Sequence, residues 1–142
     1  TPMFLHGGIM HILFNMFCLF VFGPELERIT GKMRFFTLYM LAGIFANIAT
    51  FFLEDPLYAH VGASGAIFGI FGAYGALVYY TKRSMPELRQ IILPIIVISL
   101  VMTFLQPNIN VTAHVAGLIV GFLIGLSYFN PKRIASWRTT RR

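Results

Sequence analysis

Charged residues are scarce in this sequence. Only 11% of its 142 residues are Asp, Glu, Lys or Arg, whereas 57% are hydrophobic. A soluble domain usually has about 25% charged residues, because its surface must face water. The composition therefore excludes an ordinary soluble domain and indicates a polytopic membrane protein.

Cysteine is almost absent, since Cys18 is the only one in the chain. No disulfide can form within the chain, and no cysteine metal site can be built. Cys18 lies in an apolar run, where a thiol acts as a small hydrophobic side chain. An initiator residue and a secretory leader pattern are also lacking before the first apolar run, so we expect the chain to belong to a longer protein.

Long hydrophobic runs are what the sequence has instead. Each run is close to the length that crosses a ~30 Å hydrocarbon core as a helix. The runs lack barrel alternation, and lipid cannot satisfy the backbone of an open sheet. We therefore predict an all-α fold, a polytopic transmembrane helical bundle over residues 1–130, followed by a basic tail over 131–142. The predicted helices lie near residues 9–23, 34–53, 64–81, 90–106 and 113–129.

The basic residues all fall on one predicted side of the membrane. The second connection carries Glu54 and Asp55 without Lys or Arg, and the fourth connection has no charge. The positive-inside rule makes the basic side cytoplasmic, so the net charge of +6 reports topology and not binding to nucleic acid. With five spans, the chain then begins outside, which predicts at least one further helix upstream. The basic residues are Arg28, Lys32 and Arg34 in the first connection, Lys82, Arg83 and Arg89 in the third, and Lys132, Arg133, Arg138, Arg141 and Arg142 in the tail.

Four polar residues stand at one predicted depth. His11, Asn15, Ser64 and His114 lie in the first turns of the first, third and fifth spans, which all run from outside to inside. Polar and ionisable groups within a membrane are unfavourable and are usually functional. Taken singly, Ser64 between glycines is typical of helix packing, and Asn15 of an interhelical hydrogen bond. Their shared depth favours a functional site.

Glycines spaced by four residues predict which helices touch. Gly117, Gly121 and Gly125 share a face of the fifth span with His114, and Gly65 and Gly69 recur in the third span. Small residues at this spacing let two backbones approach closely in lipid. We therefore expect the third and fifth helices to form a close pair in which Ser64 and His114 can meet.

These residues suit acyl transfer. A serine hydroxyl needs a base to take its proton, and His114 is the candidate at the right depth. Because no Asp or Glu lies at that depth, we predict a Ser–His dyad, with the imidazole oriented by packing or by another hydrogen bond. Phe68, one turn after Ser64, is a candidate to pack on the ring. Backbone N–H groups at Ala63 and Ser64, with the side chains of His11 and Asn15, can stabilise an oxyanion.

The assembled residues resemble the rhomboid family of intramembrane serine proteases. Four stretches are similar to family motifs: "HGGIMHILFN" (6–15), "ELERITGKMRFFTLY" (25–39), "GASG" (62–65) and "AHVAGLIVGFLIG" (113–125). The resemblance implies that Ser64 is the nucleophile and His114 the base. It also implies an oxyanion hole of His11, Asn15 and the amides of Ala63 and Ser64, and no metal or cofactor. We expect Gly62, Gly65 and Gly117 to allow the close approach of the helices around this site.

The resemblance also predicts the activity of the protein and its class of substrate. The five spans correspond to the second to sixth core helices of the family, so the first helix and most of the outer loop after it lie outside this chain. We predict an intramembrane serine endopeptidase that cleaves transmembrane protein substrates near their outer ends. The expected location is a bacterial inner membrane, with the site toward the outer side. The alternative is a catalytically inactive rhomboid-like protein that binds transmembrane clients. A transporter or channel is disfavoured by the charge-poor spans and the lack of inverted repeats.

Overall fold

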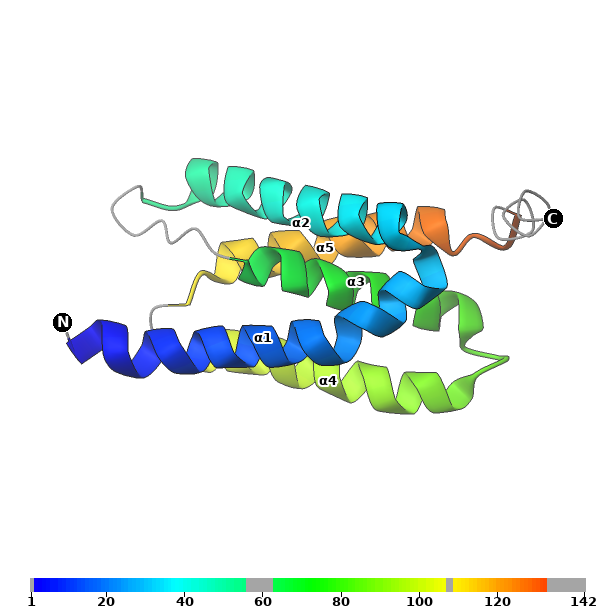
Figure 1. Ribbon diagram of the computed structural model, residues 1–142, viewed down its shortest axis with the longest axis horizontal. Coiled ribbons are helices and arrows are strands. Elements are labelled where there is room, and N and C mark those ends of the chain that lie inside the picture. Colours follow the sequence, from blue (N-terminus) through cyan, green and yellow to red (C-terminus); the bar gives the residue numbers. More distant parts are fainter. Residues whose placement is uncertain (1, 56–62, 107–108, 133–142) are drawn as a thin grey trace.

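The chain folds into a bundle of helices, as predicted (Figure 1). The computed structural model describes residues 2–55, 63–106 and 109–132, and side chains from residue 9 onward within these ranges. Within these ranges no strand is present, which confirms the all-α prediction. The helices are α1 (Pro2–Thr30), α2 (Lys32–Leu53), α3 (Ser64–Thr81), α4 (Pro86–Leu105) and α5 (Val111–Tyr128).

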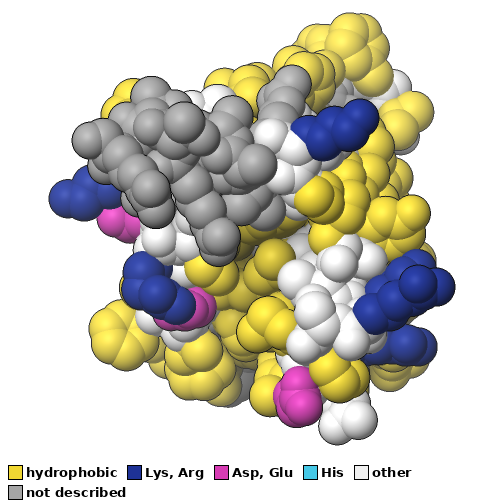
Figure 2. All heavy atoms as spheres, turned by 90° about the vertical axis from the view of Figure 1, so that its right-hand side faces the viewer, with side chains coloured by type: hydrophobic (Ala, Val, Ile, Leu, Met, Phe, Trp, Pro, Cys, Tyr) yellow, Lys and Arg dark blue, Asp and Glu magenta, His cyan; other side chains and the backbone are white. Residues whose placement is uncertain are grey.

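The helices alternate in direction, so each end of the bundle has a distinct set of residues. Helices α1, α3 and α5 all begin at the left-hand end of Figure 1, and α2 and α4 run back toward it. Figure 2 looks onto the opposite end, where Lys and Arg side chains lie around the edge of the face. We call this opposite end the basic end. The described basic residues flank its turns and the end of α5: Arg28, Lys32, Arg34, Lys82, Arg83, Arg89 and Lys132.

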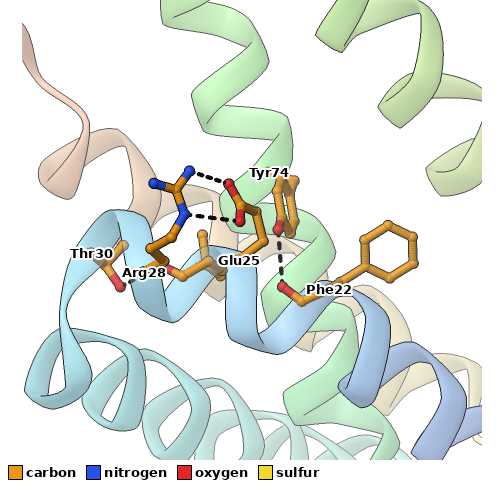
Figure 3. Close-up of polar contacts among 6 residues, drawn as sticks. Phe22, Glu25, Arg28, Thr30 and Tyr74 are labelled. Carbon is orange, nitrogen blue, oxygen red and sulfur yellow. Dashed lines mark hydrogen bonds and ion pairs between the residues drawn. The ribbon is translucent and has the colours of Figure 1, made fainter.

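Helix α1 is longer than its apolar run, because it continues through Pro24 to Thr30. Proline removes one helical hydrogen bond and bends a helix, and Figure 1 shows the end of α1 turning toward α2. A hydroxyl from α3 contacts the backbone next to this bend: Tyr74 donates to the carbonyl oxygen of Phe22 at 2.9 Å. On the exposed side, Arg28 pairs with Glu25 at 2.5 Å (Figure 3), an i,i+3 contact that supports the extra turns.

A single glycine joins α1 to α2. Gly31 has φ 93°, a conformation that L side chains rarely adopt, so a residue with a Cβ would be strained here. Its N–H donates to the backbone carbonyl of Glu27 at 2.7 Å, and its carbonyl accepts from the N–H of Phe35 at 3.0 Å. The chain can therefore end one helix and start the next with one residue between them.

Helix α3 is the centre of the bundle. Thirteen of its 18 residues are buried, and the other four helices all pack against it. In the described part of the chain, four helices are long and apolar enough to cross a membrane: α1 from Ile9 onward, α2, α4 and α5. Helix α3, one of the five predicted spans, is not among them, because its serine, glycines and tyrosines dilute its apolar residues. Helix α3 is thus enclosed mostly by the other helices and not by lipid.

The outer helices carry the apolar surface that suits lipid. Their large hydrophobic side chains point outward, as at Phe20 on α1 and Met33 and Phe52 on α2, each at least three-quarters exposed. A soluble protein rarely exposes such a continuous apolar surface. The membrane-crossing helices and this apolar surface together indicate an integral multi-pass membrane protein.

Helices α3 and α5 meet backbone to backbone along their glycines, as the spacing predicts. A Cβ at Gly117 would overlap the carbonyl oxygen of Gly65, and one at Gly121 would overlap that of Gly69. On another face of α3, a Cβ at Gly65 would press against Ala46 of α2 at 2.5 Å. Helix α3 therefore lies in close contact with α2 and α5 at once, and the starts of α3 and α5 are held side by side.

Candidate active site

Ser64 is the first residue of α3, at the end of the bundle opposite the basic end. Its side chain is buried, and Ala63 precedes it as the N-cap residue without a side-chain cap. The first helical hydrogen bond at this end runs from Ile67 N–H to the carbonyl of Ala63 at 3.1 Å. The N–H groups of Ser64 and its next two residues thus have no acceptor within the helix, and they are the donors that a helix start offers to an anion.

His114 lies in the first turn of α5 and is only 3% exposed. Its ring is stacked on Phe68 of α3, with centroids 4.2 Å apart and planes inclined by 14°. The ring of His11 on α1 is also nearly parallel to it, at 6.2 Å and 10°. Side chains from three helices therefore converge on one place, and Phe68 has the packing position expected for it.

The two ring nitrogens of His114 have different surroundings. Nδ1 lies 2.9 Å from the hydroxyl of Thr103 on α4. Nε2 is buried and has no hydrogen-bond partner within the described part of the chain. A buried polar atom without a partner is unfavourable by about 1–3 kcal/mol and calls for an explanation. A ring nitrogen kept open in this way is suited to exchange a proton with a bound group.

Ser64 and His114 are neighbours, although no hydrogen bond joins them in this structure. A Cβ at Gly65, the residue after Ser64, would lie 3.3 Å from the carbonyl oxygen of Ala113, the residue before His114. Catalytic hydrogen bonds are often long or poorly aligned in a protein without substrate. Direct contact between α3 and α5 thus brings Ser64 and His114 close together, while Nε2 of His114 has no hydrogen bond to any described residue.

The other predicted site residues that the structure describes lie at the same end of the bundle as Ser64 and His114. Asn15 is buried on α1, one turn after His11, so the two residues share a helix face. Ala63 and Gly65 flank Ser64, and Gly117 follows His114 by three residues against the backbone of Gly65. Gly62 lies outside the described residues.

The start of α5 is fixed by a residue that the sequence analysis did not single out. Asn110 is the N-cap of α5, and its Oδ1 accepts from Ala113 N–H at 2.9 Å. Its Nδ2 donates to the hydroxyl of Thr50 on α2, also at 2.9 Å. Nearby, the Thr112 hydroxyl donates to the carboxylate of Glu54. The signal was available, because asparagine three residues before the first buried turn is a typical N-cap.

Thr103 is the second residue that was missed. It follows Ser99 by four residues inside an apolar run, where a hydroxyl usually bonds back to its own helix. Only the placement of α4 beside α5 brings this hydroxyl to His114. Elsewhere, the described residues contain no group of three or more His, Cys, Asp or Glu that could hold a metal ion. The chemistry that this site can offer is a hydroxyl, an imidazole base and a helix start whose first N–H groups have no acceptor within the helix.

Comparison with known proteins gives independent information on the family of this chain. The family model for the Rhomboid domain matches residues 1–131. A protein of Bacillus subtilis, YdcA, whose name marks it as a candidate rhomboid protease, is 44% identical over 87% of this chain and 63% of its own length. The rhomboid protease GluP of the same organism is 42% identical over 93% of this chain and 26% of its own length.

A plant relative is similar as well. RHOMBOID-like protein 7 of Arabidopsis thaliana is 37% identical over 88% of this chain and 40% of its own length. This chain therefore spans less than two thirds of the length of each of these relatives. No solved structure gives a significant match.

Proposed function

Because the chain belongs to the rhomboid family, we propose that it carries the active site of an intramembrane serine endopeptidase. In this proposal Ser64 is the nucleophile and His114 is the general base. The observation that carries it is the buried imidazole of His114 next to the start of α3, whose Nε2 has no hydrogen-bond partner among the described residues. The names of two relatives, which include the words rhomboid protease, support the same activity.

The first step is attack by the Ser64 hydroxyl oxygen on the scissile carbonyl carbon. Nε2 of His114 takes the hydroxyl proton as the new C–O bond forms, which is the usual activation of a serine nucleophile. The tetrahedral intermediate then collapses, and the protonated imidazole gives its proton to the leaving amine. An acyl-enzyme at Ser64 and a free amino end remain.

The second step is the reverse sequence with water. Nε2 takes a proton from water, the hydroxide attacks the ester carbonyl, and the proton returns to Ser64 as the carboxylic product leaves. Each proton that is taken up by His114 is given back, so the imidazole is unchanged after one turnover. No metal or cofactor is needed for either step.

We assign the oxyanion to the start of α3. The first N–H groups of this helix, including that of Ser64, have no acceptor within the helix, and the helix dipole favours negative charge here. The backbone N–H of Ala63 and the side chains of His11 and Asn15 complete the proposed donor set. Burial strengthens such donors, because they act where water is scarce.

The substrate class follows from the depth of the site. Ser64 and His114 lie at the end opposite the basic end, which the positive-inside rule assigns to the outer side. A peptide bond near the outer end of a transmembrane segment can reach that depth. The proposed partners are therefore transmembrane protein substrates within the lipid bilayer, and the proposed location is a bacterial inner membrane with the C-terminal tail in the cytoplasm.

The test is serine reactivity in the full-length protein, reconstituted in liposomes. A fluorophosphonate probe should label the wild type, the label should vanish in Ser64→Ala, and it should fall sharply in His114→Ala. A transmembrane reporter should be cut by the wild type alone. If folded wild-type protein takes no label and cuts no reporter, the alternative of an inactive, client-binding rhomboid-like protein replaces this proposal.

A further inference from the structure

We propose that Thr103 is a positioning residue that fixes the tautomer of His114. Its hydroxyl holds the imidazole in the form that carries the proton on Nδ1 and leaves the lone pair on Nε2. The tautomer itself follows from the contacts around the ring. Its consequence for catalysis rests on the proposed function of Ser64 and His114.

The assignment comes from counting hydrogens at the Thr103 hydroxyl. This oxygen lies 2.9 Å from two atoms, the carbonyl oxygen of Ser99 and Nδ1 of His114. A hydroxyl has one hydrogen, and a carbonyl oxygen can only accept. The hydrogen therefore goes to Ser99, and the hydroxyl oxygen must accept from His114. Nδ1 is then the protonated nitrogen, and in the neutral ring Nε2 is the base.

The same arrangement occurs a second time in the bundle, with a partner whose role is unambiguous. The Thr50 hydroxyl donates to the carbonyl of Ala46 at 2.9 Å and accepts from Nδ2 of Asn110 at 2.9 Å. The orientation of the Asn110 amide is set by Ala113 N–H, which needs Oδ1 as its acceptor. A threonine that bonds back to its own helix thus serves as an acceptor for a neighbouring helix at this end of the protein.

Thr103 is well placed to act as a fixed acceptor. It is 2% exposed, so water does not compete for its oxygen. A β-branched side chain has few rotamers in a helix, and the bond to Ser99 selects one of them. Phe68 sets the plane of the imidazole, and Thr103 sets its rotation within that plane. The two contacts together direct Nε2 to one place.

An uncharged partner suits this depth. In soluble serine proteases the corresponding nitrogen donates to a buried aspartate. A carboxylate within the membrane carries a large desolvation penalty, whereas a threonine hydroxyl that is already bonded to its own helix carries little. Thr103 can therefore fix the tautomer without placing a second ionisable group beside His114.

The experiment uses full-length protein in three versions: Thr103→Val, which keeps the shape and removes the hydroxyl, Thr103→Ser, which keeps the hydroxyl, and Thr30→Val. Thr30 is a matched control, because it is equally buried and bonds back to Leu26 at 2.9 Å, but it lies at the turn between α1 and α2. Cleavage of a transmembrane reporter in liposomes gives kcat and KM. Loss of a partner that orients a metal-binding histidine typically costs about 10–100-fold in affinity or activity, and we expect a fall of the same order in kcat for Thr103→Val, with KM unchanged.

The tautomer is read directly by NMR of protein labelled with ¹⁵N-histidine, with the His114 signals identified by their loss in His114→Gln. Wild type should show a protonated Nδ1 and an unprotonated Nε2, and Thr103→Val a mixture of both tautomers. Thr103→Ser should restore the wild-type spectrum and most of the rate, and Thr30→Val should match wild type in both.

The possible outcomes test the role of Thr103 and the protease function separately. A protonated Nε2 in wild type, or a folded Thr103→Val with wild-type kcat and spectrum, overturns the role of Thr103. If Thr103→Val does not fold, the wild-type spectrum and the rate of Thr103→Ser still decide. If wild type neither cuts the reporter nor reacts with the serine probe, the proposed protease function fails, while the spectrum continues to test the tautomer.

Discussion

The two ends of the bundle differ in how far their buried polar groups are hydrogen-bonded. Toward the basic end, tyrosine hydroxyls from two helices donate to backbone carbonyls of other helices: Tyr74 to Phe22, Tyr80 to Leu126 and Tyr128 to Arg34, at 2.9 to 3.1 Å. At the opposite end, one ring nitrogen of the buried His114 has no hydrogen-bond partner in the part of the chain that the structure describes. The tyrosine hydrogen bonds hold helices together, whereas we propose that the unbonded nitrogen of His114 acts in catalysis.

The first prediction tests whether the two ends face opposite sides of the membrane. Its expected effect is the largest, because one position should be labelled and the other should not. Asp55 follows α2, and Arg83 lies between α3 and α4; both are exposed. With Asp55→Cys and Arg83→Cys, a membrane-impermeant thiol reagent on sealed cells should label residue 55 only. The native Cys18 is buried and serves as the background. Labelling of both positions from one side would contradict the topology.

The second prediction breaks the packing that assembles the site. Gly121→Leu should force α3 and α5 apart, because even a Cβ there overlaps the carbonyl oxygen of Gly69. We expect complete loss of reporter cleavage and a strongly lowered Tm, although Ser64 and His114 are untouched. Gly75→Ala is the matched control on α3, since its Cβ would make an ordinary contact of 3.5 Å with Phe122. Full activity in Gly121→Leu would remove the role of the glycine faces.

The third prediction weakens the start of α5 alone. Asn110→Ala removes both the cap to Ala113 and the bond to Thr50. Loss of an N-cap costs about 0.5–2 kcal/mol, so the Tm should fall moderately, and kcat should fall with it because His114 lies in the same turn. Asn110→Ser should recover the cap but not the bond to Thr50. Denaturation curves and reporter kinetics distinguish these contributions, and an unchanged Tm in Asn110→Ala would argue against both.

The fourth prediction concerns the basic end and is the smallest. Tyr80→Phe removes one hydrogen bond, from the hydroxyl to the carbonyl of Leu126 at 3.0 Å, and leaves the ring in place. A typical intramolecular hydrogen bond contributes about 0.5–1.5 kcal/mol, so we expect a slightly lower Tm and unchanged kcat and KM. A large loss of activity without loss of stability would show that the two ends do not have separate roles.

Much of this architecture was predictable from local sequence patterns. Apolar runs predicted the helices, and glycine spacing predicted the contact between α3 and α5. The shared depth of Ser64 and His114 followed from counting spans. These features depend on periodicity and length, which are properties of the chain alone.

The remaining features depend on tertiary contacts. The first span was predicted near residues 9–23, with a helical extension through Glu25 and Glu27 left open; in the structure α1 continues through Pro24 to Thr30. Thr103 could not be recognised from the sequence, because its partner His114 lies on another helix and a threonine in an apolar run is ordinary. The glycine spacing predicted α3 and α5 as a close pair, but it did not show that α1, α2 and α4 also pack against α3.

The order of the helices along the chain has a consequence for biosynthesis. Helices α1 and α2 leave the ribosome before α3, so the small residues of α2 that α3 packs against, such as Ala46, are already made when α3 emerges. His114 arrives only with α5, the last of the described helices. On the proposed assignment, Ser64 therefore stays without its base until α5 has been translated.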